Sequence, residues 1–83
     1  MTDSMVDQAT VWLKEWFAQR APDVKLREQD NFFNEGAIDS FGIIELIEEV
    51  ETKFSIRFSE QDFQNRGFPT IEGLARIISE KGS

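Results

Sequence analysis

Residues 40–53 constrain the fold of this chain more than any other segment, because their apolar side chains recur at the spacing of an α-helix. When each residue is advanced by about 100° around a helix axis, one stripe roughly 100° wide collects most of the large apolar side chains. Its members are Ile43, Leu46, Ile47, Val50 and Phe54. A helix with one such stripe is stable only when other elements cover it, so the rest of the chain must supply them.

Two further amphipathic helices are predicted, one on either side of this segment. The first begins near a Ser4-x-x-Asp7 pattern that is typical of a helix start, and it ends before Pro22. Its stripe consists of Val6, Ala9, Thr10, Leu13, Trp16, Phe17 and Arg20, with Trp12 at the edge. The last helix follows Thr70, which is expected to cap it, and residues 79–82 are expected to trail away from its end. Its apolar face consists of Ile71, Leu74, Ala75 and Ile78.

Residues 21–39 lack helical periodicity and are rich in turn-forming residues, so a long loop is predicted there. The loop also contains several large apolar side chains, which would not be left in water. We expect these side chains to hold the loop against the helices. They are Val24, Leu26, Phe32, Phe33 and Ile38.

Between the second and last helices, residues 54–59 (FSIRFS) are too short and isolated for a sheet and are expected to form a packed connector. A Ser59-x-x-Asp62 pattern then predicts one short helical turn around Phe63. The predicted fold is therefore all-α: a small bundle of three principal helices plus one short helix, with a long loop between the first two. With 83 residues, the chain is expected to form a single domain over residues 1–83.

Histidine and cysteine, on which many enzymes depend, are missing from this sequence. The chain has no histidine and no cysteine, so neither a hydrolytic triad nor a transition-metal site can be assembled from it. It also has no glycine-rich loop of the GxxxxGK[ST] or GxGxxG type that would hold a nucleotide. We therefore expect no metal site and no catalysis by this chain alone.

Charge narrows the range of partners. Sixteen acidic against nine basic side chains give a net charge of −7, which would repel the phosphate backbone of a nucleic acid. No apolar stretch is long enough for a membrane span, and residues 1–10 do not resemble a signal sequence. These features predict a soluble cytoplasmic monomer that binds neither nucleic acid nor membrane, and a basic protein surface is its natural complement.

Two large apolar residues on the helix at 40–53 lie outside the buried stripe. Phe41 and Ile44 fall on the opposite side and alternate there with three glutamates, Glu45, Glu48 and Glu51. Isolated exposed apolar residues are common on proteins, so this exposure can be incidental. An apolar patch with an acidic rim is also typical of a docking face, and its position at the start of the helix favours that interpretation.

Ser40 opens the same helix and admits two interpretations. In the first, its hydroxyl is the N-cap of the helix, a role that contributes about 1 kcal/mol. In the second, Ser40 is an attachment point for a phosphate ester, because the unpaired N–H groups and the dipole at a helix N-terminus favour an anion. The residues around Ser40 bear on this choice.

Residues 36–41 (GAIDSF) look like the attachment motif of the acyl carrier proteins, small helical modules that carry acyl or aminoacyl groups on a phosphopantetheine arm. Four other segments resemble that family in the same order and spacing: residues 30–33 (DNFF), the glutamate-rich helix at 43–54, the connector at 58–63, and residues 70–74 (TIEGL). The resemblance covers nearly the whole chain.

This resemblance implies a carrier rather than an enzyme. Ser40 would bear 4'-phosphopantetheine covalently, added by a phosphopantetheinyl transferase that uses coenzyme A and magnesium, and Asp39 would be recognised by that transferase. The terminal thiol of the arm would hold cargo as a thioester. Phe41, Ile44, Glu45, Glu48 and Glu51 match the positions at which family members contact their partners, here acyl-loading and acyl-processing enzymes with basic patches.

Three departures from the family pattern bear on the cargo. Phe41 replaces the usual leucine, the spacer Ala37-Ile38 is one residue longer than in carriers of fatty acid synthesis, and Glu48 stands where those carriers often have methionine. The motif is more similar to carriers of specialised pathways, including polyketide, aminoacyl and D-alanyl carriers. The alternative from a different class is a small acidic helical interaction module without a prosthetic group, in which Ser40 only caps its helix.

Overall fold

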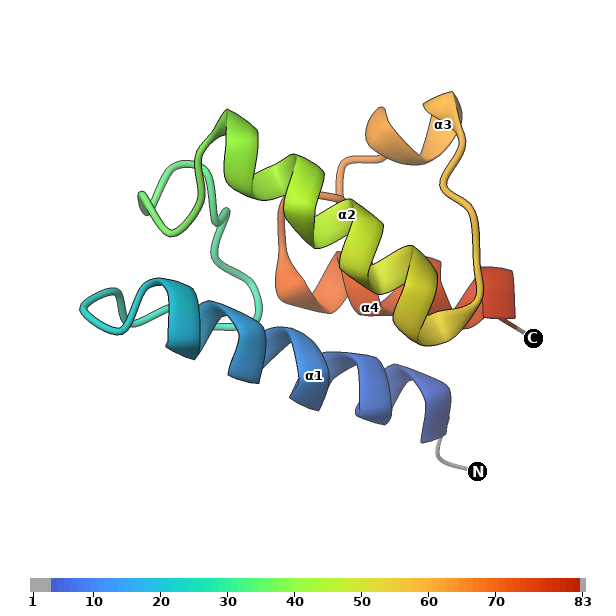
Figure 1. Cartoon of the computed structure of the whole chain (residues 1–83), viewed down its shortest axis with the longest axis horizontal. Helices are drawn as coiled ribbons and strands as arrows, with labels where there is room; N and C mark the ends of the chain where they lie inside the picture. Colours follow the sequence, from blue (N-terminus) through green and yellow to red (C-terminus); the bar gives the residue numbers. More distant parts are fainter. Residues whose placement is uncertain (1–3, 83) are drawn as a thin grey trace.

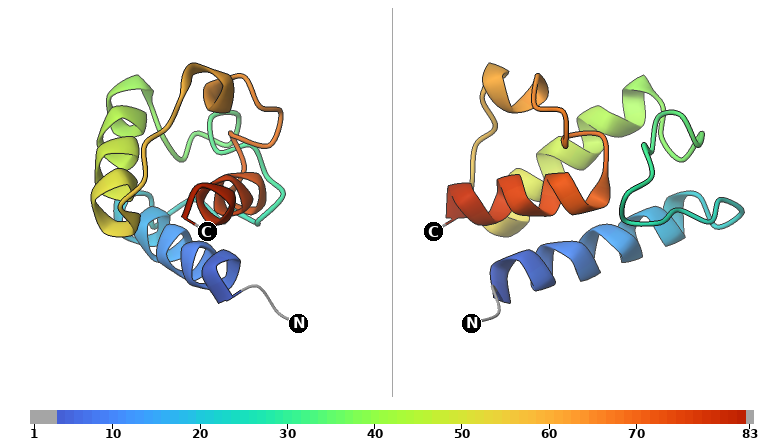
Figure 2. Two further views of the ribbon diagram at one scale, coloured as in Figure 1. Left: turned by 90° about the vertical axis from the view of Figure 1, so that its right-hand side faces the viewer. Right: turned by 180° about the vertical axis from the view of Figure 1, so that it is seen from behind.

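Figure 1 shows the computed structural model of the chain, which describes residues 4–82. Within these residues the helices are α1 (Ser4–Arg20), α2 (Ser40–Phe54), α3 (Glu60–Phe63) and α4 (Ile71–Gly82), and no strand is present. Helices α1 and α4 lie side by side, α2 lies against this pair, and α3 lies on the side of the bundle away from α1 (Figures 1 and 2). The predicted all-α bundle is confirmed.

The core is built from the predicted apolar stripes. Helix α1 buries Ala9, Leu13, Trp16 and Phe17, and α2 buries Leu46 and Val50. Helix α4 buries the predicted Ile71, Leu74, Ala75 and Ile78, and also Ile77, which was not predicted. The remaining stripe residues of α2 are partly buried and pack against this core. Trp12 lies at the edge of the core as predicted, with its ring edge-to-face against Phe54 at a centroid distance of 5.9 Å. Each stripe is thus covered by the other helices, except at Arg20, which was predicted in the stripe of α1 but is exposed.

The long loop is held by one fully buried aromatic ring. Phe32 stacks on Phe17 with ring centroids 5.0 Å apart, and its backbone N–H donates to the carbonyl of Pro69 at 2.8 Å. Val24, Leu26 and Ile38 are partly buried, as predicted. The prediction for Phe33 is wrong, because its side chain is 41% exposed. Asn31 starts a turn by accepting the N–H of Phe33 at 2.9 Å, and the Phe33 ring contacts the buried ring of Phe32, with centroids 5.2 Å apart.

The starts of the last two helices follow the predicted caps. The backbone N–H of Ser59 donates to the Asp62 carboxylate at 2.7 Å, and α3 follows at residue 60. The N–H of Gly73 donates to the Thr70 hydroxyl at 2.9 Å at the start of α4. The side chain of Ser4, which was predicted to cap α1, is not among those that the structure describes. The connector after α2 is not a strand and buries Ile56, as expected.

Two features of α4 were not foreseen. The prediction that residues 79–82 trail away is wrong, since the helix continues to Gly82, Ser79 is buried, and Lys81 forms an ion pair with Asp62 at 2.7 Å. In addition, a Cβ on Gly73 would lie 2.1 Å from the carbonyl oxygen of Gly67, so a side chain has no room there. None of the helices in residues 4–82 combines the length and apolar composition that a transmembrane span requires.

Candidate functional site

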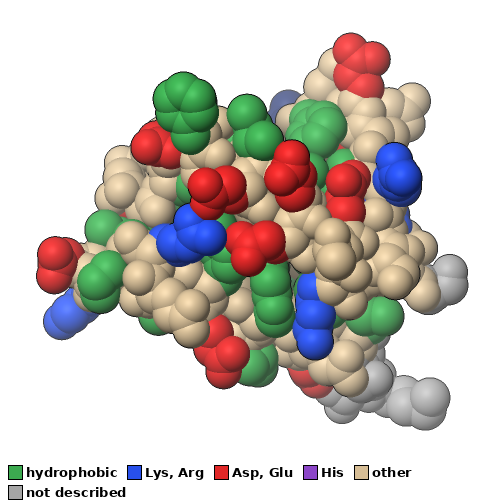
Figure 3. Space-filling view, in the orientation of Figure 1, with side chains coloured by type: hydrophobic (Ala, Val, Ile, Leu, Met, Phe, Trp, Pro, Cys, Tyr) green, Lys and Arg blue, Asp and Glu red, His purple; other side chains and the backbone are tan. Residues whose placement is uncertain are grey.

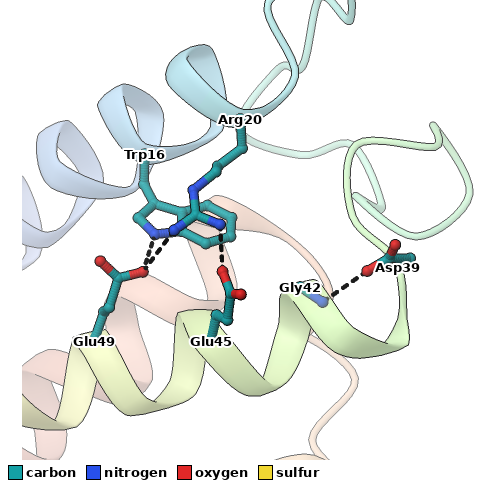
Figure 4. Close-up of polar contacts among 6 residues, drawn as sticks. All are labelled: Trp16, Arg20, Asp39, Gly42, Glu45 and Glu49. Carbon is teal, nitrogen blue, oxygen red and sulfur yellow. Dashed lines mark hydrogen bonds and ion pairs between the residues drawn. The ribbon is translucent and has the colours of Figure 1, made fainter.

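The N-terminus of α2 is capped by Asp39, which precedes Ser40. Asp39 has an extended backbone (φ −112°, ψ −176°), and its Oδ1 accepts the backbone N–H of Gly42 at 2.7 Å (Figure 4). The interpretation of Ser40 as the cap is therefore wrong. The capping residue must have a non-helical backbone, and Ser40 is already the first residue inside the helix.

Ser40 is exposed, and its hydroxyl makes no hydrogen bond within residues 4–82. Helix geometry leaves the first N–H groups of α2 without intrahelical acceptors, and Asp39 satisfies only that of Gly42. The N–H groups of Ser40 and Phe41 are thus available to an anion joined to the Ser40 oxygen. The site combines a free hydroxyl with the positive end of a helix dipole.

The first turn of α2 is also shaped by Gly42. A Cβ at this position would lie 2.9 Å from Cγ1 of Ile38 and 3.2 Å from Oδ1 of Asp39. Glycine at 42 therefore lets Ile38 pack onto the helix and lets Asp39 reach its hydrogen bond. The loop before it turns at Gly36, whose φ of +74° is a left-handed conformation that favours glycine.

The outward side of α2 carries the apolar residues that the sequence placed there. Phe41 is 80% exposed and Ile44 is 57% exposed. Figure 3 shows apolar side chains along the edge formed by α2 and α3, with acidic side chains beside them on α2. A shallow apolar groove runs between the two helices and is lined by Ile43, Ile44, Ile47, Glu48 and Phe63.

Phe63, which is 49% exposed, also belongs to this surface. The sequence did not predict this. Phe63 packs on Phe68 at a centroid distance of 5.2 Å and extends the apolar surface from α2 onto α3. A helix of four residues is too short for a face to be assigned from periodicity, so the sequence carried no signal for it.

The three glutamates predicted at the docking face have different surroundings. Glu45 forms an ion pair with Arg20, and Oε2 of Glu51 accepts the backbone N–H of Phe58 at 2.9 Å. Glu48 is exposed and has no hydrogen bond or ion pair among the described residues. The structure thus places all three on α2 but leaves only Glu48 without an intramolecular partner in the part of the chain that it describes.

Glu49, which the sequence did not single out, belongs to the same cluster as Glu45. Its Oε2 accepts the indole N–H of Trp16 at 2.6 Å and lies 3.4 Å from Nη2 of Arg20 (Figure 4). The hydrogen bond to Glu45 and the charges of both glutamates raise the pKa of Arg20 above its ordinary value, despite some loss of hydration. Arg20 therefore joins the end of α1 to the outer side of α2.

No group of three or more acidic side chains in the described part of the chain is arranged to hold a metal ion. Comparison with known protein families gave a match to the family described as phosphopantetheine attachment site, over residues 12–78. Searches of curated proteins and of solved structures found no match. Members of the matched family bear 4'-phosphopantetheine covalently on a serine and serve as carriers for other enzymes. This chain belongs to the phosphopantetheine-attachment family and is a carrier protein.

Proposed function

We propose that the chain carries acyl or aminoacyl intermediates as thioesters on a 4'-phosphopantetheine arm attached to Ser40. Three serines lie within the matched range, namely Ser40, Ser55 and Ser59. Ser55 is at the C-terminal end of α2, where the helix dipole disfavours an anion. The Ser59 hydroxyl donates to the Asp62 carboxylate at 3.0 Å, beside which a phosphate would be repelled. Of the three, Ser40 alone combines a helix N-terminus with a hydroxyl that has no partner among the described residues, and this observation carries the proposal.

Attachment of the arm removes only one atom from this chain, the hydroxyl proton of Ser40. The Ser40 oxygen bonds to the phosphorus that bears the pantetheine group of coenzyme A, the bond from that phosphorus to the leaving nucleotide breaks, and the serine proton passes to a base of the transferase. Magnesium belongs to the transferase reaction. Asp39 remains an acidic residue next to the reacting oxygen, which suits its recognition by a basic group of the transferase, while its Oδ1 caps α2.

We propose that partner enzymes dock on the outward side of α2 and the adjoining part of α3. Phe41, Ile44 and Phe63 supply apolar contact, and Glu48 supplies a carboxylate with no partner among the described residues. Glu45 and Glu51 lie beside them but already have intramolecular partners. A small surface of mixed character suits a carrier, because each contact with a loading or processing enzyme must be transient.

The proposed cargo belongs to a specialised pathway, polyketide or aminoacyl, rather than to fatty acid synthesis. This preference rests on Phe41, the two-residue spacer at 37–38 and Glu48. A survey of loading enzymes with amino acid and acyl substrates would decide it, since the cargo is chosen by the enzyme that forms the thioester. We further propose that residues 1–83 act as one carrier domain and as a monomer.

The attachment is tested by intact mass spectrometry after incubation with coenzyme A, magnesium and a promiscuous phosphopantetheinyl transferase. The mass is expected to rise by one phosphopantetheinyl group in the native chain and in Ser55→Ala and Ser59→Ala, and to stay unchanged in Ser40→Ala. Loading of a folded Ser40→Ala variant would refute the assignment. A native chain that is never loaded would favour the interaction module without a prosthetic group.

A further inference from the structure

We propose that Arg20 determines which carboxylates of α2 a partner enzyme can contact. By pairing with Glu45 and Glu49 it withdraws both from docking, so that Glu48, rather than Glu45 or Glu49, meets a partner's cation. The inference rests on the proposed carrier function and concerns its partner specificity.

The contacts of Arg20 fix its guanidinium between α1 and α2. One Nη is hydrogen-bonded to Glu45, and the other lies 3.4 Å from Glu49 (Figure 4). The guanidinium carbon also lies 4.8 Å from the centroid of the Trp16 ring. Trp16 in turn donates its indole N–H to Glu49, so the ring and the carboxylate that hold the arginine are joined to each other. A planar guanidinium with five N–H donors can hydrogen-bond two carboxylates while its face lies over an aromatic ring.

These pairs are solvent-exposed, so they contribute little to folding, but the charge of Arg20 partly offsets that of the two carboxylates beside it. The side chains of Arg20, Glu45 and Glu49 are 47%, 54% and 46% exposed, and ion pairs of this kind contribute little to stability. A partner's lysine or arginine that approached Glu45 would compete with Arg20 for the carboxylate oxygens.

Glu48, unlike Glu45, is not paired with a cation among the described residues and lines the apolar groove. It lies one helical turn after Ile44, and both side chains line the apolar groove between α2 and α3. Among the described residues no cation is paired with Glu48, so none has to leave before a partner can contact it. A cation at Glu48 would therefore meet the acidic group and the apolar surface together.

The test compares Arg20→Gln with Arg76→Gln, using the rate of loading by a phosphopantetheinyl transferase. Both variants remove one positive charge from an exposed arginine that pairs with a glutamate, but Arg76 lies on α4 and pairs with Glu72. Arg20→Gln is expected to raise kcat/KM roughly threefold or more at low salt, and the gain should shrink at high salt, because freed carboxylates steer a basic partner. Arg76→Gln is expected to have a smaller effect, and Arg20→Lys, which keeps the charge, should stay closer to the native rate.

Arg20→Gln could speed loading either by freeing Glu45 to contact the transferase or by making the whole chain more negative. A double-mutant cycle distinguishes these two explanations. Glu45→Gln should slow loading more in the Arg20→Gln background than in the native chain, because only there is Glu45 free to contact the transferase. In the native background, Glu48→Gln should slow loading more than Glu45→Gln, and this comparison does not depend on the folding of any Arg20 variant.

Equal losses for Glu45→Gln in the two backgrounds, or a loss at Glu48 no greater than that at Glu45, would overturn the role of Arg20 while leaving attachment at Ser40 intact. Failure of the native chain to be loaded would overturn both proposals.

Discussion

The carboxylate of Asp39 accepts the backbone N–H of Gly42 at 2.7 Å and so closes the first turn of α2. Because this cap is supplied by the residue before Ser40, the serine hydroxyl is not needed to hold the helix. These two adjacent polar residues thus have separate roles: Asp39 caps the N-terminus of α2, and Ser40 is left exposed at the positive end of the helix.

The first prediction concerns stability at this pair. Ser40→Ala is expected to change the free energy of unfolding by less than about 0.5 kcal/mol, because no hydrogen bond of its side chain within residues 4–82 is lost. Asp39→Ala is expected to cost about 1 kcal/mol, since it removes the cap. Urea unfolding followed by circular dichroism measures both. A larger cost for Ser40→Ala than for Asp39→Ala would contradict the observed cap.

A second prediction distinguishes two roles of Asp39, capping of α2 and recognition of its negative charge by the transferase. Asn caps helices about as well as Asp, so Asp39→Asn should keep nearly native stability. Its loading by a phosphopantetheinyl transferase should still be slower, if a basic group of the transferase recognises the carboxylate. The ratio of kcat/KM between the native chain and Asp39→Asn is the measurement. Equal loading would show that Asp39 serves only the helix.

The third prediction concerns the apolar part of the docking surface. Phe41→Ser should leave the free energy of unfolding within about 0.5 kcal/mol of the native value, because the side chain is 80% exposed. The variant should nevertheless weaken binding to the transferase, seen as a higher KM. Val11→Ser on α1, where the side chain is 56% exposed, is the matched control and should keep the native KM. An equal change in both variants would argue against a localised surface.

The fourth prediction concerns the contact between α4 and the turn before it. Gly73→Ala should destabilise the protein by roughly 1–3 kcal/mol, because the added Cβ would overlap the backbone carbonyl of Gly67. This reverses the gain of about 1 kcal/mol that Gly→Ala gives in an open helix. Thermal or urea unfolding measures the sign.

Gly42→Ala provides the comparison for that variant. Its Cβ would approach side-chain atoms of Ile38 and Asp39, which can shift more readily than a backbone carbonyl. The cost should therefore be smaller than at Gly73. A stabilised Gly73→Ala variant would show that the backbone at Gly67 can move away from the added Cβ at little cost in free energy.

The last prediction concerns acid. Burial raises the pKa of Asp62, but the hydrogen bond and charge of Lys81 and the hydrogen bonds from Ser59 outweigh it, so the pKa lies below its ordinary value. The folded state therefore holds the proton less tightly than the unfolded state. The resulting stability is present above the unfolded pKa of about 4 and is lost as the pH falls through the lower folded pKa.

Asp62→Asn should accordingly be less stable than the native chain at neutral pH and should lose less stability on acidification. Urea unfolding at several pH values between about 7 and about 2.5 measures the difference in slope. The backbone N–H and side chain of Arg27 also lower the pKa of Asp30, which contributes with the same sign and remains in the variant. Identical slopes in the two proteins would show that the Asp62–Lys81 pair does not contribute.

Periodicity in the sequence was enough to predict the helices, their buried faces and the outward position of Phe41 and Ile44. Such a prediction depends only on the angle between successive residues of a helix, which is the same wherever the helix lies. The order of segments around GAIDSF similarly indicated the family, which the match over residues 12–78 confirmed.

The choice of cap at α2, the partners of the glutamates and the exposure of Phe63 were decided only by tertiary structure. Asp39 and Ser40 are both good caps by type, and backbone conformation alone distinguishes them. Glu45 and Glu48 are alike in sequence, but α1 brings Arg20 to Glu45 across 25 residues, while no described cation reaches Glu48. Contacts between segments distant in the chain depend on how the helices pack, and helical spacing within one segment contains no information about them.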